Sequence, residues 1–126
     1  MITAESDNKN YSTCVSNGIA VINSDTTEDK GGSGEYFRPH DLLCAAYASC
    51  LNISVRMVLD KMGLKYDKVI TNVDMDRENE GNTIFIYHVE IIGDIDIPTK
   101  EAAITKALNC PVRKTLSKNI SFQPMK

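Results

Sequence analysis

The chain of 126 residues contains 42% hydrophobic and 25% charged residues, which suits one domain with a sizeable core and is too little for two average domains. We therefore expect a single domain over residues 1–126. Its 14 Lys and Arg residues against 17 Asp and Glu residues give a net charge of -3, so the basic excess that binding to nucleic-acid phosphates requires is missing. Nucleic acid is excluded as an expected partner.

The number of cysteines and the composition of the first residues indicate the cellular compartment in which the protein is expected. Four cysteines are too sparse for a disulfide scaffold, and the first ten residues, MITAESDNKN, have neither the positive flank nor the apolar stretch of a signal peptide. The most apolar stretch, residues 42–59, is interrupted by Ser49, Asn52, Ser54 and Arg56, which favours a buried helix over a membrane span. We expect a soluble protein of the reducing cytoplasm, with no membrane partner.

The first half of the chain predicts a hairpin, a loop and a long helix. Asn17-Gly18 between two β-leaning runs is typical of a two-residue hairpin turn, and the polar, glycine-rich residues 25–34 predict a mobile loop. Residues 41–62 then form the longest helical pattern, which Gly63 ends. Apolar residues occur on almost all sides of this helix. A second copy of the chain, or a sheet folded around the helix, is needed to cover it.

The second half predicts two strands, two helices and a last strand. Residues 68–76 alternate between apolar and polar side chains, and residues 83–92 are β-branched and aromatic, so the two segments are expected to pair as an antiparallel hairpin. Thr99 can cap a helix that runs through Leu108. Pro111 opens a further helix to about Ser117, and residues 120–123 form a strand. The order predicts an α+β fold without βαβ alternation.

Two cysteines stand where thiol chemistry is conceivable. Cys50 lies in the middle of the apolar helix, where most cysteines are inert small hydrophobic residues. Cys110 directly precedes Pro111, so it is expected at the N-terminal cap of the following helix, where the helix dipole favours a thiolate. Position by itself does not decide between these interpretations.

Two motifs resemble one family. The stretch RPHDLLCAAYASC, followed by a helix that ends at Gly63, resembles the segment of the OsmC and Ohr family of organic hydroperoxide reductases that carries the peroxidatic cysteine. The stretch KALNCPVRKTLSKNISF resembles the same family's later helix, Cys-Pro pair, helical turn and final strand. Together the motifs and the order of elements cover nearly the whole chain.

This resemblance implies both a fold and an activity. The family fold is an α+β intertwined homodimer, with antiparallel sheets around a long central helix and active sites at the interface. By the same resemblance, Cys50 attacks the O–O bond of an organic hydroperoxide and Cys110 resolves the sulfenic acid as a disulfide, in oxidative stress defence. An external dithiol returns the electrons, and no bound cofactor is required. The residue types suit this chemistry, because only a thiolate attacks and a nearby thiol prevents over-oxidation.

The chain departs from the family at two positions. The family's reductases have a glutamate directly after the proline, where this chain has His40, and an arginine from an N-terminal strand, whereas no arginine here precedes Arg38. At 100° per residue, His40 lies about 80° from Cys50 around a helix and Asp41 lies about half a turn away. We expect Arg38 or protonated His40 to supply positive charge, with Arg56 as a further candidate. Arg38→Ala is expected to slow alkylation of Cys50 at pH 7 more than His40→Ala does.

Two other functions stay open at this level. The missing arginine favours an OsmC-like dimer that has weak or no peroxidase activity and binds a small hydrophobic or thiol ligand. A metal-binding protein could instead use His40, Cys44 and Cys50, which are soft or borderline ligands. Cys14 is expected to be structural, and His88 is expected at the surface or in a cross-strand pair.

Overall fold

The computed structural model of the protein describes residues 1–125. The chain divides into two compact units, the first over Met1–Leu43 and the second from Cys44 onward. Helix α1, Pro39–Lys61, begins in the first unit and continues into the second. It starts two residues earlier than its pattern predicts, because Pro39 is tolerated in a first turn, where its missing amide hydrogen is not needed.

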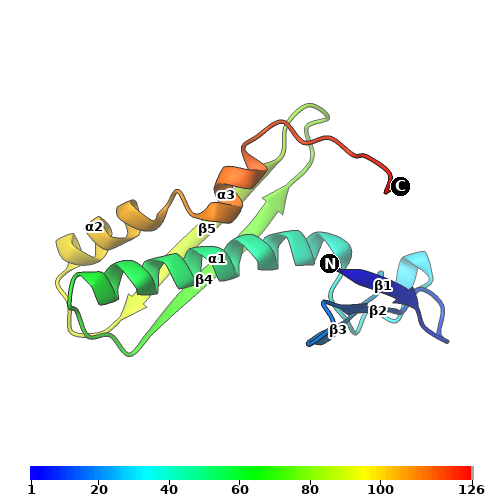
Figure 1. Ribbon diagram of the computed structural model, residues 1–126, viewed down its shortest axis with the longest axis horizontal. Helices are drawn as coiled ribbons and strands as arrows, with labels where there is room; N and C mark the ends of the chain where they lie inside the picture. Colours follow the sequence, from blue (N-terminus) through cyan, green and yellow to red (C-terminus); the bar gives the residue numbers. More distant parts are fainter. Residues whose placement is uncertain (126) are drawn as a thin grey trace. The chain divides into compact units, whose positions relative to one another are not determined.

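The first unit contains a three-stranded antiparallel sheet in the order β1-β2-β3. Its strands are β1, Thr3–Ser6, β2, Thr13–Ser16, and β3, Val21–Ser24 (Figure 1). The predicted hairpin between β2 and β3 is confirmed. Strand β1, which pairs with the other edge of β2, was not expected, since its sequence TAES lacks a strand's apolar alternation.

The turn of that hairpin differs from the prediction. Ser16 pairs with Val21, so the loop has four residues and the predicted two-residue turn is wrong. The Asn17 side chain explains the longer loop, because its oxygen accepts hydrogen bonds from the amides of Ile19 and Ala20 at 2.9 and 2.7 Å. Asparagine side chains commonly organise turns in this way.

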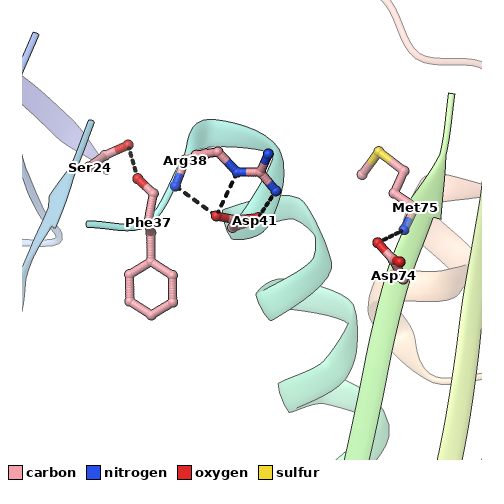
Figure 2. A network of polar contacts seen from close by, with 6 residues as sticks. All are labelled: Ser24, Phe37, Arg38, Asp41, Asp74 and Met75. Atoms are coloured by element: carbon pink, nitrogen blue, oxygen red, sulfur yellow. Dashed lines mark hydrogen bonds and ion pairs between the residues drawn. The ribbon is translucent and has the colours of Figure 1, made fainter. Parts of the chain in front are cut away.

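The loop after β3 is held by polar contacts. It contains a short 3-10 helix, η1, at Glu28–Lys30. The Asp25 carboxylate, in a residue only 5% exposed, accepts hydrogen bonds from the Ser33 hydroxyl at 2.8 Å and from the amides of Thr26 and Ser33 at 2.7 and 3.1 Å. These donors, the Ser33 hydroxyl foremost, lower the pKa of Asp25. The Ser24 hydroxyl also donates to the Phe37 carbonyl at 2.9 Å (Figure 2).

The second unit is built on an antiparallel hairpin of β4, Lys68–Asp76, and β5, Ile84–Ile92, as predicted. Helix α1 runs along this hairpin (Figure 1). Its buried side chains recur every fourth residue and form one stripe: Tyr47, Leu51, Val55 and Leu59. Two hydrogen bonds tie helix and sheet together: Asn52 donates to the Val69 carbonyl at 2.8 Å, and Thr71 donates to the Ala48 carbonyl at 2.9 Å.

Within the single chain only one face of α1 is buried, and the expected cover of the other sides by a second copy stays a prediction. Ile53 and Met57 are 44% and 63% exposed, because the hairpin and the later helices of the second unit pack on the opposite face. Helix α1 is also long and apolar enough to cross a membrane, a test that core helices of soluble proteins pass as well. It ends as predicted, with Gly63 in a left-handed conformation at φ 70°.

Two further helices complete the second unit: α2, Ile97–Ala107, and α3, Pro111–Leu116. The predicted cap at Thr99 is wrong, because Asp96 is the N-cap residue and Pro98 takes a place in the first turn. Cys110 occupies the N-cap position of α3 as predicted, and its side chain makes no capping hydrogen bond. The predicted strand at residues 120–123 does not form: a strand needs a partner backbone, and no strand among residues 1–125 pairs with it.

Candidate functional site

Cys50 and Cys110 meet where α1 and α3 approach each other. Cys50 is partly buried against the core, and Cys110, sixty residues later, is only 2% exposed. The amide of Val112, two residues after Cys110, donates a hydrogen bond to the Cys50 sulfur at 3.4 Å, and the Cys50 thiol is close enough to raise the pKa of Cys110. No disulfide bond joins them in this structure. The structure thus brings together the two cysteines that the sequence singles out.

The Cys110 thiol is kept protonated by its surroundings. Burial is the largest cause and raises the pKa of Cys110, and the contact with Cys50 raises it further. The amides of Arg113 and Val112 act in the opposite direction without overcoming this effect. A neutral thiol is therefore the resting form of Cys110 at pH 7.

Three aromatic side chains line the same region. Tyr47 lies three residues before Cys50 on α1, is 3% exposed, and meets Phe85 and Tyr87 of β5 edge-on, with ring centroids 5.9 and 6.1 Å away. Burial raises the pKa of Tyr47, while the charge and a hydrogen bond of Arg113 lower it by less. Tyr47 therefore presents a neutral hydroxyl group.

Arg113 on α3 is the cation of this region. Its guanidinium carbon lies 6.0 Å from the centroid of the Tyr87 ring, and its Nη1 donates to the Leu108 carbonyl at 3.5 Å. Burial acts to lower the pKa of Arg113, but the interactions with Tyr47 and Tyr87 outweigh it and raise the pKa. The Arg113 side chain is thus fixed and charged.

The predicted cations Arg38 and His40 belong to the first unit. Arg38 forms a two-pronged ion pair with Asp41, with Nη2 and Nε of Arg38 2.9 and 3.2 Å from the carboxylate oxygens (Figure 2). The hydrogen bonds from Arg38 lower the pKa of Asp41. His40 lies in the first turn of α1 and is exposed. Their predicted role in thiol chemistry stays a prediction.

The remaining candidates lie outside the site that Cys50 and Cys110 form, which we call the dithiol site. Arg56 is exposed and donates to the Asn52 side chain at 2.9 Å. His88 is exposed and pairs across the sheet with Asn72, as expected. Cys14 lies in β2 and is partly buried. Over residues 1–125 no group of three His, Cys, Asp or Glu side chains could hold a metal ion, so the geometry does not support the metal-binding alternative of His40, Cys44 and Cys50.

Sequence reasoning missed Tyr47, Tyr87 and Arg113 as members of the site. The spacing of three residues between Tyr47 and Cys50 places both near one helical face, which was a usable signal. Arg113 likewise stands three residues after Cys110. Tyr87 gave no such signal, because an aromatic residue in a strand is most simply explained by packing.

Known proteins share this fold. The family described as OsmC-like protein matches residues 32–124, whereas no curated protein sequence matches the chain. An OsmC-like protein from Mycoplasma pneumoniae has a TM-score of 0.75 at 20% identity, with 92% of this chain and 85% of that chain covered. Organic hydroperoxide resistance proteins from Legionella pneumophila and Elizabethkingia anophelis each have a TM-score of 0.67, at 21% and 22% identity. Both alignments cover 94% of this chain, with 89% and 87% of the other.

At these identities the solved structures show the fold, which is the mixed helix and antiparallel-sheet fold of OsmC and Ohr proteins. The family match covers most of the chain, including both cysteine motifs. The protein therefore belongs to the OsmC family.

Proposed function

We propose that the protein is a thiol-dependent peroxidase that reduces organic hydroperoxides, with Cys50 as the attacking and Cys110 as the resolving cysteine. The observation that carries this proposal is the hydrogen bond from the Val112 amide of α3, two residues after Cys110, to the Cys50 sulfur of α1, together with the effect of Cys50 on the pKa of Cys110. Relatives of similar fold described as organic hydroperoxide resistance proteins support the substrate class.

The proposed peroxidase cycle has three steps. The Cys50 thiol loses its proton, and its thiolate attacks the hydroperoxide, so that an S–O bond forms and the O–O bond breaks. The sulfur is oxidised to a sulfenic acid and the leaving alkoxide takes up a proton as an alcohol. The Cys110 sulfur then gives up its proton and attacks the Cys50 sulfur, and the proton leaves with the hydroxyl group of the sulfenic acid as water, so that a disulfide remains. An external dithiol reduces this disulfide by thiol exchange and is itself oxidised.

Burial and hydrogen bonding support this division of labour. Cys50 is partly exposed and receives the Val112 amide, and an amide N–H directed at sulfur stabilises negative charge there. Cys110 is buried, and burial raises its pKa. The more accessible sulfur thus suits attack on a hydroperoxide, and the enclosed thiol suits a second step that needs no substrate access.

The test is to trap the sulfenic acid after treatment with cumene hydroperoxide. Cys50→Ser should abolish trapping, whereas Cys110→Ser should let the sulfenic acid persist and become over-oxidised. Cys14→Ser and Cys44→Ser are the matched controls and should behave as the parent chain. Identical behaviour of the Cys50 and Cys110 variants, or trapping at Cys14 or Cys44, contradicts the proposal. A parent chain that forms no sulfenic acid would instead favour an OsmC-like protein that binds a small ligand.

We also propose that the working form is a homodimer, with the exposed apolar face of α1 covered by a second copy. The support is that face itself, which exposes Ile53 and Met57 on a long helix of high mean hydropathy. Sedimentation at micromolar concentration should show a dimer. Ile53→Lys with Met57→Lys should weaken it, whereas Glu78→Lys in the exposed turn after β4 should not. A parent chain that sediments as a monomer with its helical signal intact contradicts the proposal.

A further inference from the structure

We propose that Arg113 supplies the positive charge of the dithiol site. This inference rests on the peroxidase function proposed above and concerns a residue that the sequence motifs did not single out. Arg113 directly follows Val112, whose amide contacts the Cys50 sulfur, and it lies three residues after Cys110, the N-cap residue of the same helix.

The Arg113 side chain is anchored by elements that frame the two cysteines. It lies over the Tyr87 ring of β5 at 6.0 Å and donates to the Leu108 carbonyl at 3.5 Å. It also interacts electrostatically with Tyr47, which lies three residues before Cys50 on α1. One guanidinium group therefore joins the helix that carries Cys50 to the helix that carries Cys110.

The proposed reaction needs such a charge. Negative charge starts on the Cys50 sulfur and passes to the leaving alkoxide as the O–O bond breaks, and a nearby fixed cation stabilises both forms. An arginine stays charged at every pH at which the protein works. A histidine would instead lose its charge above about pH 6.5.

Arg38 and Arg56, the two arginines that the sequence offered as sources of charge, have other interactions. Arg38 is ion-paired with Asp41 and its side chain is 58% exposed, so the carboxylate and the solvent both offset its charge. Arg56 is exposed and bonded to Asn52. Lys114, next to Arg113, is exposed and therefore offers a matched control that removes one charge from the same helix.

The experiment measures the rates of Cys50 alkylation and of sulfenic acid formation between pH 6 and pH 10, in the Cys110→Ser background. Arg113→Gln should slow both reactions about tenfold at pH 7 and move the midpoint of the pH profile upward by about one unit, the shift that corresponds to a tenfold change. Arg113→Lys should restore most of the rate, because it restores the charge. Lys114→Gln should stay within about twofold of the background chain. Arg38→Gln, which removes the rival source of charge, should slow both reactions less than Arg113→Gln does.

Circular dichroism distinguishes a variant that has lost only the charge of Arg113 from one that has lost its helical fold. If Arg113→Gln loses its helical signal, Tyr87→Phe takes its place in the test. This change keeps the aromatic ring and removes the hydroxyl group beside Arg113. A smaller upward shift of the midpoint of the pH profile is then expected. An unchanged profile overturns the inference, as does equal slowing at every pH or a larger effect of Arg38→Gln. A parent chain without sulfenic acid refutes the peroxidase function itself, whereas a reactive parent with an equally reactive Arg113→Gln variant refutes only the role of Arg113.

Discussion

The two units of the chain keep different kinds of residue away from water. All nine apolar residues that are buried among residues 1–125 belong to the second unit, whereas the three buried polar residues, Ser12, Ser24 and Asp25, belong to the first. The second unit is therefore stabilised mainly by its hydrophobic core and the first mainly by hydrogen bonds. The dithiol site lies in the unit with the core, where burial can act on a thiol.

The largest effect is expected from a cavity in the second unit. Leu51 is 0% exposed, and Leu51→Ala should lower the free energy of unfolding by about 2–5 kcal/mol, because the methyl groups leave a cavity that the core fills only in part. Urea denaturation measures this loss. Ile86→Ala, at a side chain 55% exposed, is the control and should change stability by less than about 0.5 kcal/mol. Equal losses for both would remove the distinction between core and surface.

A smaller and local effect is expected in the first unit. A Cβ atom at Gly32 would overlap the Thr26 carbonyl oxygen and lie 2.6 Å from an Asp25 carboxylate oxygen. Gly32→Ala should therefore strain the loop by about 1–3 kcal/mol and speed amide exchange at Thr26 and Ser33. Gly81→Ala has room, with its nearest neighbour at 3.5 Å, and should leave exchange unchanged. Faster exchange in β4 and β5 would show that the two units do not respond separately.

Alkaline solution should weaken the second unit through the dithiol site. The pKa of Cys110 and that of Tyr47 are both raised by burial, so the folded chain holds these protons more tightly than the unfolded chain does. Their contribution to stability is complete below the unfolded pKa values, about 8.5 for cysteine and 10 for tyrosine, and is lost as the pH rises through the folded values. The urea midpoint of the reduced protein should fall above about pH 8.5.

Removing these two groups tests the origin of the fall. Cys110→Ser with Tyr47→Phe should show a shallower decline of the urea midpoint over the same pH range, while Cys14→Ser should follow the parent chain. If the parent chain keeps a flat profile up to pH 11, burial does not hold these protons as the structure indicates.

The smallest effect is expected at the ion pair of the first unit. Arg38 and Asp41 have side chains 58% and 37% exposed, and exposed pairs contribute little. Arg38→Ala should lower the free energy of unfolding by less than about 1 kcal/mol in thermal denaturation. Because Arg38 lowers the pKa of Asp41, this contribution is present above about pH 4 and is lost as the pH falls through the folded value. A loss as large as that of Leu51→Ala would contradict this ranking.

The sequence predicted those elements that local chemistry decides. The alternation in residues 68–76 and the β-branched run after it gave both long strands and their pairing, and Gly63 and Pro111 marked helix boundaries correctly. The predictions were wrong where side-chain or tertiary contacts determine the local structure. The Asn17 side chain lengthened a turn, and residues 120–123 found no partner strand in the described chain.

The candidate site was predictable only in part for the same reason. The resemblance to one family singled out Cys50 and Cys110, and the structure brings Cys50 against the start of the helix that Cys110 precedes. The Arg113 side chain could not be assigned from sequence, because its place depends on Tyr47 and Tyr87, which come from two other elements. Only the packing of α1, β5 and α3 brings these groups together.

The 59 residues that lie between Cys50 and Cys110 would couple the proposed disulfide to the stability of the fold. A bond between the two sulfurs would close a ring of backbone that includes both long strands and all of α2, and a covalent ring of this size restricts the unfolded chain by about 4 kcal/mol. The oxidised protein should then resist heat and proteases better than the reduced one. Its lifetime in the cell would be coupled to the supply of reductant, so that the protein persists longest when peroxide is most abundant.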